Sequence, residues 1–218
     1  MIKLFAHRGF VTKNAGQNTI ASLKEAVAQN FQAIEFDIWF LHGGLFLKHD
    51  EPEFREINNL PILQDYFCFK NDLTYWMDLK NLDERNSAKA LELVKIEIEA
   101  AKINLNQIYF APFITADYEK AAKVLAEIRK VFGAEVQVVG FCKNLEKAED
   151  LENLRKFLEK NEVKFLSIFH ELIDENLVKT LQGVKLFAWT VNELPRLYEL
   201  ARIGVINFAT DKITPEKL

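Results

Sequence analysis

Three short groups of polar residues within the first fifty positions could together carry out chemistry on a phosphate ester. They are His7-Arg8-Gly9, Glu35-Phe36-Asp37 and His49-Asp50. Glu35 and Asp37 lie two residues apart in an apolar run with the pattern of a strand, so both carboxylates project from one face. Paired carboxylates repel each other unless a cation lies between them, and their oxygens suit Mg²⁺ or Ca²⁺. With a histidine on either side, the set indicates metal-assisted acid–base chemistry.

The elements that must position these residues alternate along the whole sequence. The strand candidates are residues 2–8, 31–38, 74–80, 107–113, 136–142, 164–170, 185–191 and 205–210. The helix candidates are residues 19–30, 60–69, 84–102, 117–132, 145–160, 174–182 and 192–203. Strands that are apolar almost throughout are typical of a parallel sheet covered by helices. Eight such units predict a compact, closed (β/α)8 TIM barrel that forms a single domain over residues 1–218.

The polar residues of the apolar runs gather at one end of each run. In a barrel of this kind, the catalytic groups occupy the carboxyl ends of the strands. The residues found there are His7, Arg8, Glu35, Asp37, Asp78, Lys80, His170 and Trp189. A doubly wound open sheet is the structural alternative, but the turn after the first strand lacks the glycine-rich pattern that would seat a nucleotide. The sequence therefore predicts one site at the mouth of a barrel.

Composition narrows the class of partner. The chain has 218 residues, 49% of them hydrophobic, and a formal net charge of −4. This charge gives no basic footprint for nucleic acid, and no apolar run reaches the length of a membrane span. The two cysteines, Cys68 and Cys142, lack the spacing of a metal site, and no secretory leader is visible. We expect a cytoplasmic protein that acts on a small molecule, and the sequence leaves its oligomeric state open.

Seven stretches of the chain, taken together and in order, resemble the glycerophosphodiester phosphodiesterase family, within the larger group of phospholipase-C-like barrel phosphodiesterases. The stretches are Ala6-His-Arg-Gly9, Asn18-Thr19, Ile34-Glu-Phe-Asp37, Leu47-Lys-His-Asp50, Met77-Asp-Leu-Lys80, Ala188-Trp-Thr-Val-Asn192 and Thr210-Asp211. They span nearly the whole chain. Each stretch alone would be a weak signal, whereas the set is specific.

The resemblance implies a reaction and a role for each of eight side chains. The implied roles are general base and general acid for His7 and His49, phosphate binding for Arg8 and Lys80, metal binding for Glu35, Asp37 and Asp78, and lining of the pocket for Trp189. The implied reaction is the metal-dependent hydrolysis of glycerophosphodiesters to glycerol 3-phosphate and an alcohol. In it, a glycerol hydroxyl attacks phosphorus and expels the alcohol, and water then opens the cyclic phosphate.

The chain departs from the family pattern in three places. Gly16-Gln17 stands where the family has Pro-Glu, and Asp78 stands where it has a longer glutamate. Both changes bear on metal affinity. The segment between His49 and Asp78 is short, so the subdomain that the family inserts there is expected to be nearly absent. That change bears on the identity of the substrate.

Other interpretations of the same residues stay open. Glu35 and Asp37 could form ion pairs with Arg8 and Lys80 instead of binding a metal. His170 could contact the ligand or could be a hydrogen-bonded residue at the rim. Trp39, Trp76 and Trp189 could all be core residues, and only Trp189 lies at the predicted mouth.

Two alternatives to the diesterase function also remain. The first is a non-catalytic barrel that binds a phosphate ligand, which the changes at Gln17 and Asp78 make plausible. The second is a phospholipase D-like or lysophospholipase-type phosphodiesterase, which would need an apolar entrance. Phe10, Phe113 and Phe141 could line such an entrance, or they could belong to the core.

Overall fold

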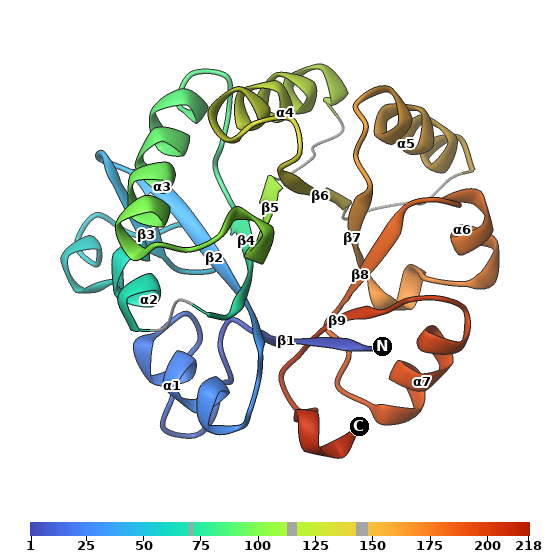
Figure 1. The fold of residues 1–218 in the computed structure, drawn as a ribbon, viewed down its shortest axis with the longest axis horizontal. Helices are drawn as coiled ribbons and strands as arrows, with labels where there is room; N and C mark the ends of the chain where they lie inside the picture. Colours follow the sequence, from blue (N-terminus) through green and yellow to red (C-terminus); the bar gives the residue numbers. More distant parts are fainter. Residues whose placement is uncertain (70–71, 113–116, 143–147) are drawn as a thin grey trace.

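Eight parallel strands close into a barrel in the computed structural model, which describes residues 1–69, 72–112, 117–142 and 148–218 (Figure 1). The strands are β1 (Lys3–His7), β2 (Ala33–Leu41), β4 (Thr74–Leu79), β5 (Ile108–Pro112), β6 (Gln137–Cys142), β7 (Phe165–Phe169), β8 (Lys185–Trp189) and β9 (Asn207–Thr210). Strand β1 pairs with both β2 and β9, which closes the ring. The predicted (β/α)8 barrel is therefore confirmed, and each predicted strand range overlaps one barrel strand, although the last residue of the range 107–113 lies outside the described residues.

Helices cover the outside of the barrel. Those in the described part of the chain are α1 (Ile20–Ala28), α2 (Leu63–Phe69), α3 (Ser87–Ala101), α4 (Tyr118–Phe132), α5 (Ala148–Lys160), α6 (Glu175–Thr180) and α7 (Leu194–Arg202). Each matches a predicted helix, although the start of the range 145–160 lies outside the described residues. Side chains of Thr19, Asp117 and Asp174 accept backbone N–H groups at the helix starts, as N-caps do. Within the described residues, no helix combines the length and the apolar character that a membrane span requires.

Aromatic side chains fill the barrel interior. Trp76 packs edge to face on Phe5 and Phe187, with ring centroids 5.6 Å and 5.0 Å apart, and Tyr109 packs edge to face on the same two phenylalanines. Alanines on neighbouring strands make room for these rings, so the interior is a packed core and not a pore. Side chains two residues further along the same strands share the inward face and lie nearer the mouth.

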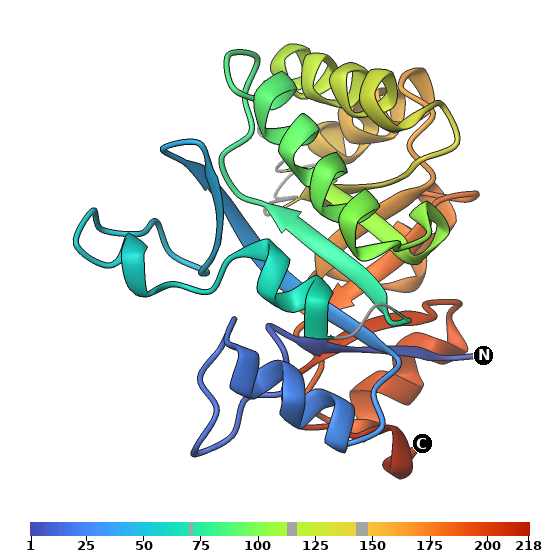
Figure 2. The same cartoon turned by 60° about the vertical axis from the view of Figure 1, so that its left-hand side comes forward.

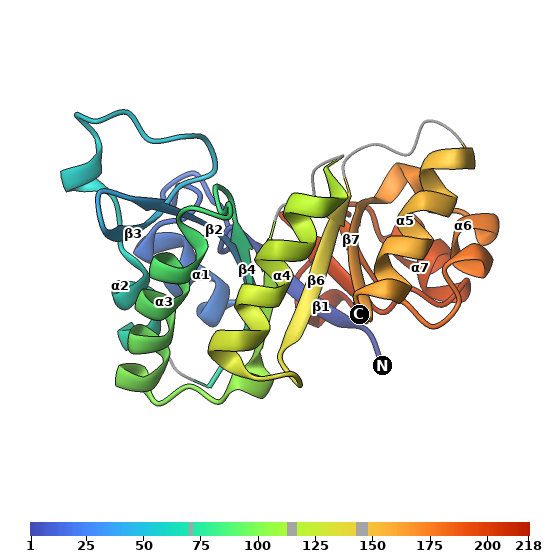
Figure 3. The same ribbon diagram turned by 90° about the horizontal axis from the view of Figure 1, so that it is seen from above.

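A hairpin that the sequence did not predict extends the sheet on one side. Strand β2 continues past the barrel and pairs antiparallel with β3 (Gly44–Leu47) through a turn in which His42 and Gly43 both have positive φ. Beyond β3, residues 48–62 contain the 3-10 turn η1 (Ile57–Asn59) and an isolated bridge from Ile62 to Phe46. Figures 2 and 3 show the hairpin and this segment standing out from the barrel. The family's insertion subdomain is thus nearly absent, as expected.

Candidate active site

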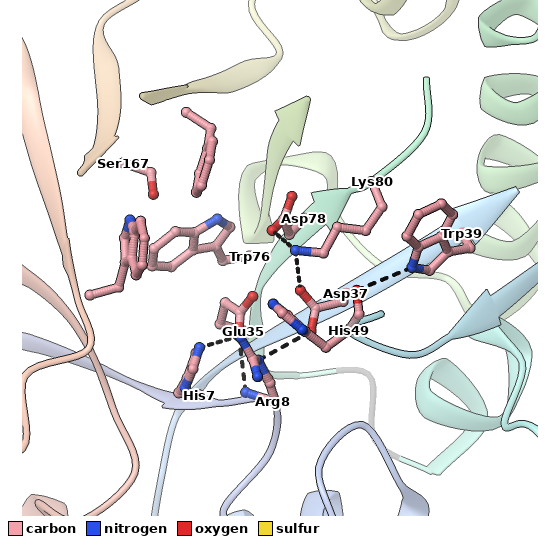
Figure 4. A pocket seen from close by; sticks show the side chains of 12 residues that line it. His7, Arg8, Glu35, Asp37, Trp39, His49, Trp76, Asp78, Lys80 and Ser167 are labelled. Atoms are coloured by element: carbon pink, nitrogen blue, oxygen red, sulfur yellow. Dashed lines mark hydrogen bonds and ion pairs between the residues drawn. The ribbon is translucent and has the colours of Figure 1, made fainter. Parts of the chain in front are cut away.

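A cavity of about 360 Å³ lies at the mouth of the barrel (Figure 4). Its lining residues are His7, Arg8, Glu35, Asp37, Trp39, His49, Trp76, Asp78, Lys80, Phe141, Ser167 and Trp189. They come from six barrel strands, β1, β2, β4, β6, β7 and β8, and from the loops and the hairpin that follow the strand ends. The fold thus brings together eight of the nine predicted site residues, and the ninth, His170, is not part of the lining.

Three carboxylates meet at the ends of β2 and β4. Glu35 and Asp37 share the inward face of β2, and the sheet register places Asp37 beside Asp78 of β4. One oxygen from each carboxylate lies within 4.8 Å of the other two, and all three residues are buried. Carboxylate oxygens are the ligands that Mg²⁺ and Ca²⁺ prefer, and here three of them lie close enough together to bind one ion.

Burial makes this cluster costly to ionise without a further cation. It raises the pKa of Glu35 to about 7, and the charge of Asp37 adds to the rise. It also raises the pKa of Asp78 to about 6, although the Lys80 ammonium opposes that rise. Desolvation and mutual repulsion both disfavour the charged carboxylates, and a divalent cation would relieve both.

The ion pairs expected as an alternative to metal binding form only in part. The Nζ of Lys80 lies 2.7 Å from Asp37 Oδ1 and 2.5 Å from Asp78 Oδ2, and Arg8 Nε lies 3.3 Å from Asp37 Oδ2. Glu35 instead accepts the backbone N–H of Arg8 at 2.9 Å. The buried Oδ1 of Asp78 has no hydrogen-bond partner among the described residues. Ion pairing therefore leaves carboxylate oxygens that a divalent cation would satisfy, and the residues present fit such an ion.

A left-handed turn after β1 sets the direction of His7 and Arg8. Arg8 and Gly9 have φ values of +57° and +75°, and both lie in the left-handed region. Glycine adopts such values without strain. A Cβ on Gly9 would lie only 2.4 Å from the Ser22 hydroxyl, which itself donates to the Arg8 carbonyl. Only glycine fits at this point, so the His-Arg-Gly order has a steric reason.

His7 is held from behind by an aspartate at the end of the last strand. Its Nδ1 lies 2.8 Å from Asp211 Oδ1, while its Nε2 lies 3.9 Å from Glu35 Oε2. Asn192 donates from Nδ2 to Asp211 Oδ2 and accepts the Asp211 backbone N–H on Oδ1. Burial would lower the pKa of His7, but the hydrogen bond to Asp211 and the charge of Glu35 raise it above its ordinary value. This arrangement favours a proton on Nδ1 and leaves Nε2 to the cavity.

His49 reaches the cavity from the segment after β3. Its side chain is about one-third exposed, and its Nδ1 lies 2.8 Å from Asp50 Oδ1. The indole N–H of Trp39 donates to the His49 carbonyl at 3.3 Å. The second imidazole is therefore less enclosed than His7, and Trp39 anchors its backbone.

Side-chain alternation along the strands explains which expectations about the lining failed. His170 follows β7 at the start of a 3-10 turn, and its position in the alternation is opposite to that of the inward Phe165 and Ser167. Ser167 lines the cavity in its place. Trp39 and Trp76 also line the cavity, so the expectation that only Trp189 would do so is wrong. Both lie on the inward faces of β2 and β4.

Other residues near the site were harder to assign from the sequence. Asn18, which precedes the N-cap Thr19 of α1, donates to Asp37 Oδ2 at 2.7 Å and accepts the Asp37 N–H, so it positions a candidate metal ligand. Of the phenylalanines considered for an apolar entrance, Phe141 lines the cavity and Phe10 packs on Phe31 with ring centroids 5.3 Å apart. Phe113 lies outside the described residues.

Solved structures share this architecture. No protein-family model matches the chain, and no curated protein matches its sequence. The fold is similar to a glycerophosphodiester phosphodiesterase from Parabacteroides distasonis, with a TM-score of 0.75, 20% identity, and coverage of 96% of this chain and 92% of the other. A phosphodiesterase from Oleispira antarctica in complex with its product sn-glycerol-3-phosphate has a TM-score of 0.73, 18% identity, and coverage of 96% and 92%. A protein from Silicibacter pomeroyi, assigned as a glycerophosphoryl diester phosphodiesterase, has a TM-score of 0.77, 16% identity, and coverage of 97% and 90%.

The chain has the fold of the glycerophosphodiester phosphodiesterases. This similarity extends over almost the full length of both chains in each pair. At these levels of identity, the likeness establishes the fold, and the chemistry has to be argued from the cavity itself.

Proposed function

We propose that this protein is a metal-dependent phosphodiesterase that hydrolyses glycerophosphodiesters to glycerol 3-phosphate and an alcohol. One observation carries the proposal: the buried carboxylates of Glu35, Asp37 and Asp78 share a cavity with two histidines and two cations. A phosphodiester needs its charge neutralised, a hydroxyl activated and an alkoxide protonated, and this cavity has candidates for all three tasks. The named phosphodiesterases with the same fold support the assignment.

The charged part of the cavity would bind the phosphate. Glu35, Asp37 and Asp78 would hold Mg²⁺ or Ca²⁺, and the ion when bound would supply positive charge to a non-bridging phosphate oxygen. Arg8 and Lys80, which now pair with Asp37, would contact the other phosphate oxygens. Their charges would then stabilise the transition state as negative charge builds on phosphorus oxygens.

The two histidines would move protons on either side of the phosphate. Nε2 of His7 would accept the proton of the attacking glycerol hydroxyl, and Asp211 would stabilise the imidazolium that forms. His49 would donate a proton to the departing alcohol oxygen, which leaves a cyclic phosphate. In the second step, His49 would take a proton from water as it attacks phosphorus, and His7 would return its proton to the glycerol oxygen.

A non-catalytic phosphate-binding barrel is the second candidate. Gln17 occupies the position where the family has an acid, and its Oε1 accepts from Arg8 Nη1 at 2.8 Å. A neutral partner for Arg8 and a short carboxylate at Asp78 could preserve ligand binding while weakening metal binding. Binding of a glycerophosphodiester without turnover would favour this candidate.

The experiment that separates the candidates is ³¹P NMR of the chelated protein with glycerophosphocholine, glycerophosphoethanolamine or a lysophospholipid. Addition of Mg²⁺ or Ca²⁺ should start the release of glycerol 3-phosphate from the first two substrates. His7→Ala and Glu35→Gln should abolish it, whereas Glu92→Gln, an exposed carboxylate change on α3, should not. Full activity in the chelated protein would refute metal dependence, and preferential cleavage of the lysophospholipid would favour the phospholipase-type alternative.

A further inference from the structure

The cavity has a charged part and a neutral part. The charged side chains come from β1, β2, β4 and the adjoining segments, and they include the carboxylates, His7, His49, Arg8 and Lys80. Trp76, Phe141, Ser167 and Trp189 make up the neutral part, which comes from β4, β6, β7 and β8. In Figure 4, Ser167 and Trp76 lie on the opposite side of the pocket from Lys80 and His49. A phosphodiester bound at the cations would therefore extend one ester arm over a neutral, largely aromatic surface.

Three polar atoms of this neutral part have no hydrogen-bond partner among the described residues. They are Nε1 of Trp76, Nε1 of Trp189 and Oγ of Ser167, and each atom is buried. Ser167 is fully buried and Trp76 is only 3% exposed. Buried polar groups normally find a partner because an unmade hydrogen bond is costly. Here three such groups line one side of one cavity, where a bound ligand would supply the missing partners.

The chemistry of these atoms restricts that ligand. The two indole N–H groups can only donate, so they need an acceptor, while the serine hydroxyl can donate and accept. A quaternary ammonium head group offers no acceptor. A carboxylate or a second phosphate would accept, but the neutral part contains no cation to balance a further buried charge. An uncharged hydroxyl meets both conditions.

We propose that Trp76, Trp189 and Ser167 form a hydroxyl-binding niche that recognises the outer hydroxyl of the glycerol arm of the substrate. The inference rests on the proposed function and adds to it two specificity-determining residues, Trp76 and Ser167. The stacked rings of Phe141 and Trp189, with centroids 5.5 Å apart, give the carbon chain of the arm an apolar wall. The inner hydroxyl of the glycerol arm, which attacks phosphorus, lies at His7. The outer hydroxyl forms hydrogen bonds with the niche.

Binding of three phosphate monoesters to the metal-loaded protein tests the niche without any need for turnover. Isothermal titration in Mg²⁺ or Ca²⁺ would compare glycerol 3-phosphate, 1,2-propanediol 1-phosphate and phosphocholine. The second ligand retains the inner hydroxyl and lacks the outer one. We expect glycerol 3-phosphate to bind at least tenfold more tightly than either of the others. Equal affinity for glycerol 3-phosphate and 1,2-propanediol 1-phosphate would overturn the niche, as would tighter binding of phosphocholine or no binding of any of the three.

Variants assign the preference to the two residues. Ser167→Ala and Trp76→Phe remove one hydrogen-bonding atom each, and they should reduce the preference for glycerol 3-phosphate to about threefold or less. Affinity for 1,2-propanediol 1-phosphate should stay within about threefold of the wild type, which a general loss of structure would not allow. Ser87→Ala, at a buried serine on α3 outside the cavity, is the matched control and should keep the full preference.

Two further results would separate the niche from the proposed function or overturn it. A preference that survives in both variants would overturn the niche. If the preference behaves as expected but no diester is hydrolysed, the proposed function fails and the niche stands as part of a binding protein. Should either variant fail to fold, the other variant and the wild-type ligand series still decide.

Discussion

Metal binding should stabilise the protein, and by an amount that depends on pH in a defined direction. Three buried carboxylates face two cations, Arg8 and Lys80, which leaves one net negative charge in the cluster at alkaline pH. The pKa of Glu35 is about 7 in the folded protein, compared with 4.5 for an ordinary glutamate. Ionisation of this carboxyl in the metal-free protein therefore lowers the free energy of unfolding by roughly 3 kcal/mol. The perturbation to make is therefore the removal and return of the divalent ion at two pH values.

The number of protons that the folded and unfolded states bind determines how stability changes with pH. Between pH 4 and 7 the folded metal-free protein holds protons on Glu35 and Asp78 that the unfolded chain has already released, because burial raises both pKa values. The free energy of unfolding therefore falls as pH rises through this range. A divalent ion competes with those protons, so its stabilising effect should be large at pH 8 and small at pH 5.

The magnitude can be worked out for a calorimetric assay. An ion at about 100 times its Kd stabilises the folded state by roughly 2.7 kcal/mol. For a domain of this size, each kcal/mol raises the Tm by about 2–4 °C, so the expected rise at pH 8 is about 5–11 °C. Scanning calorimetry of the chelated protein, with and without Mg²⁺ or Ca²⁺, measures it directly.

Glu35→Gln and Asp78→Asn should each remove most of the metal-induced rise in Tm, whereas Glu92→Gln on the exposed face of α3 should preserve it. The same variants should make the metal-free protein less sensitive to pH between 5 and 8. A Tm at pH 8 that neither ion changes would refute the metal site. So would an equal rise at pH 5 and pH 8, because protons and the ion would then not share the carboxylates.

Four further predictions concern catalysis and the turn after β1. His49→Ala should lower kcat by ~10²–10⁴ in steady-state assays, with an unchanged circular dichroism spectrum as the control for folding. Asp211→Asn removes the partner that raises the pKa of His7, so the acid limb of the kcat/KM profile should move to lower pH and kcat should fall at least about tenfold. Gly9→Ala should lower the free energy of unfolding in urea by roughly 1–3 kcal/mol more than Gly43→Ala, because only the first Cβ meets a neighbouring side chain. Glycerophosphocholine, glycerophosphoethanolamine and glycerophosphoglycerol should differ by less than about tenfold in kcat/KM, with high KM values, and a hundredfold preference with a low KM would contradict this.

The fold could be predicted from the sequence because its signals are local. Short runs that are apolar almost throughout, helical periodicity and N-caps such as Thr19 and Asp174 specify each element without reference to the rest of the chain. The hairpin at β3 was missed because Gly44–Leu47 is too short to stand out from a loop. Its pairing with β2 depends on the turn at His42 and Gly43, whose positive φ values only the structure shows.

Most of the site could be predicted because its polar residues stand at the ends of apolar runs, and eight of the nine predicted residues line the cavity. Glu35 and Asp37 follow from alternation on β2, and the same alternation would have excluded His170 in favour of Ser167. Trp76 could not be assigned in this way. Trp76 belongs both to the packed interior and to the lining of the cavity, because it lies where the two meet, and the sequence of one strand does not show where that boundary falls. Asn18 was likewise hidden, because its contact with Asp37 joins a helix start to a strand across the fold.

The cavity suggests that selectivity would be divided unequally between the two arms of a diester. The neutral part near Ser167 and Trp76 is buried, so a hydroxyl that fails to fill it would leave unpaired groups with no access to water. Residues 48–62 hold one 3-10 turn and an isolated bridge, and Phe54 within them is 81% exposed, so this segment gives the alcohol head group few fixed contacts. Hydrogen bonds to a buried arm select its chemical groups strongly, because water cannot replace them. An arm in contact with solvent is selected weakly, because water can take the place of any missing contact. An enzyme built this way would require the glycerol group strictly and accept many alcohols attached to it.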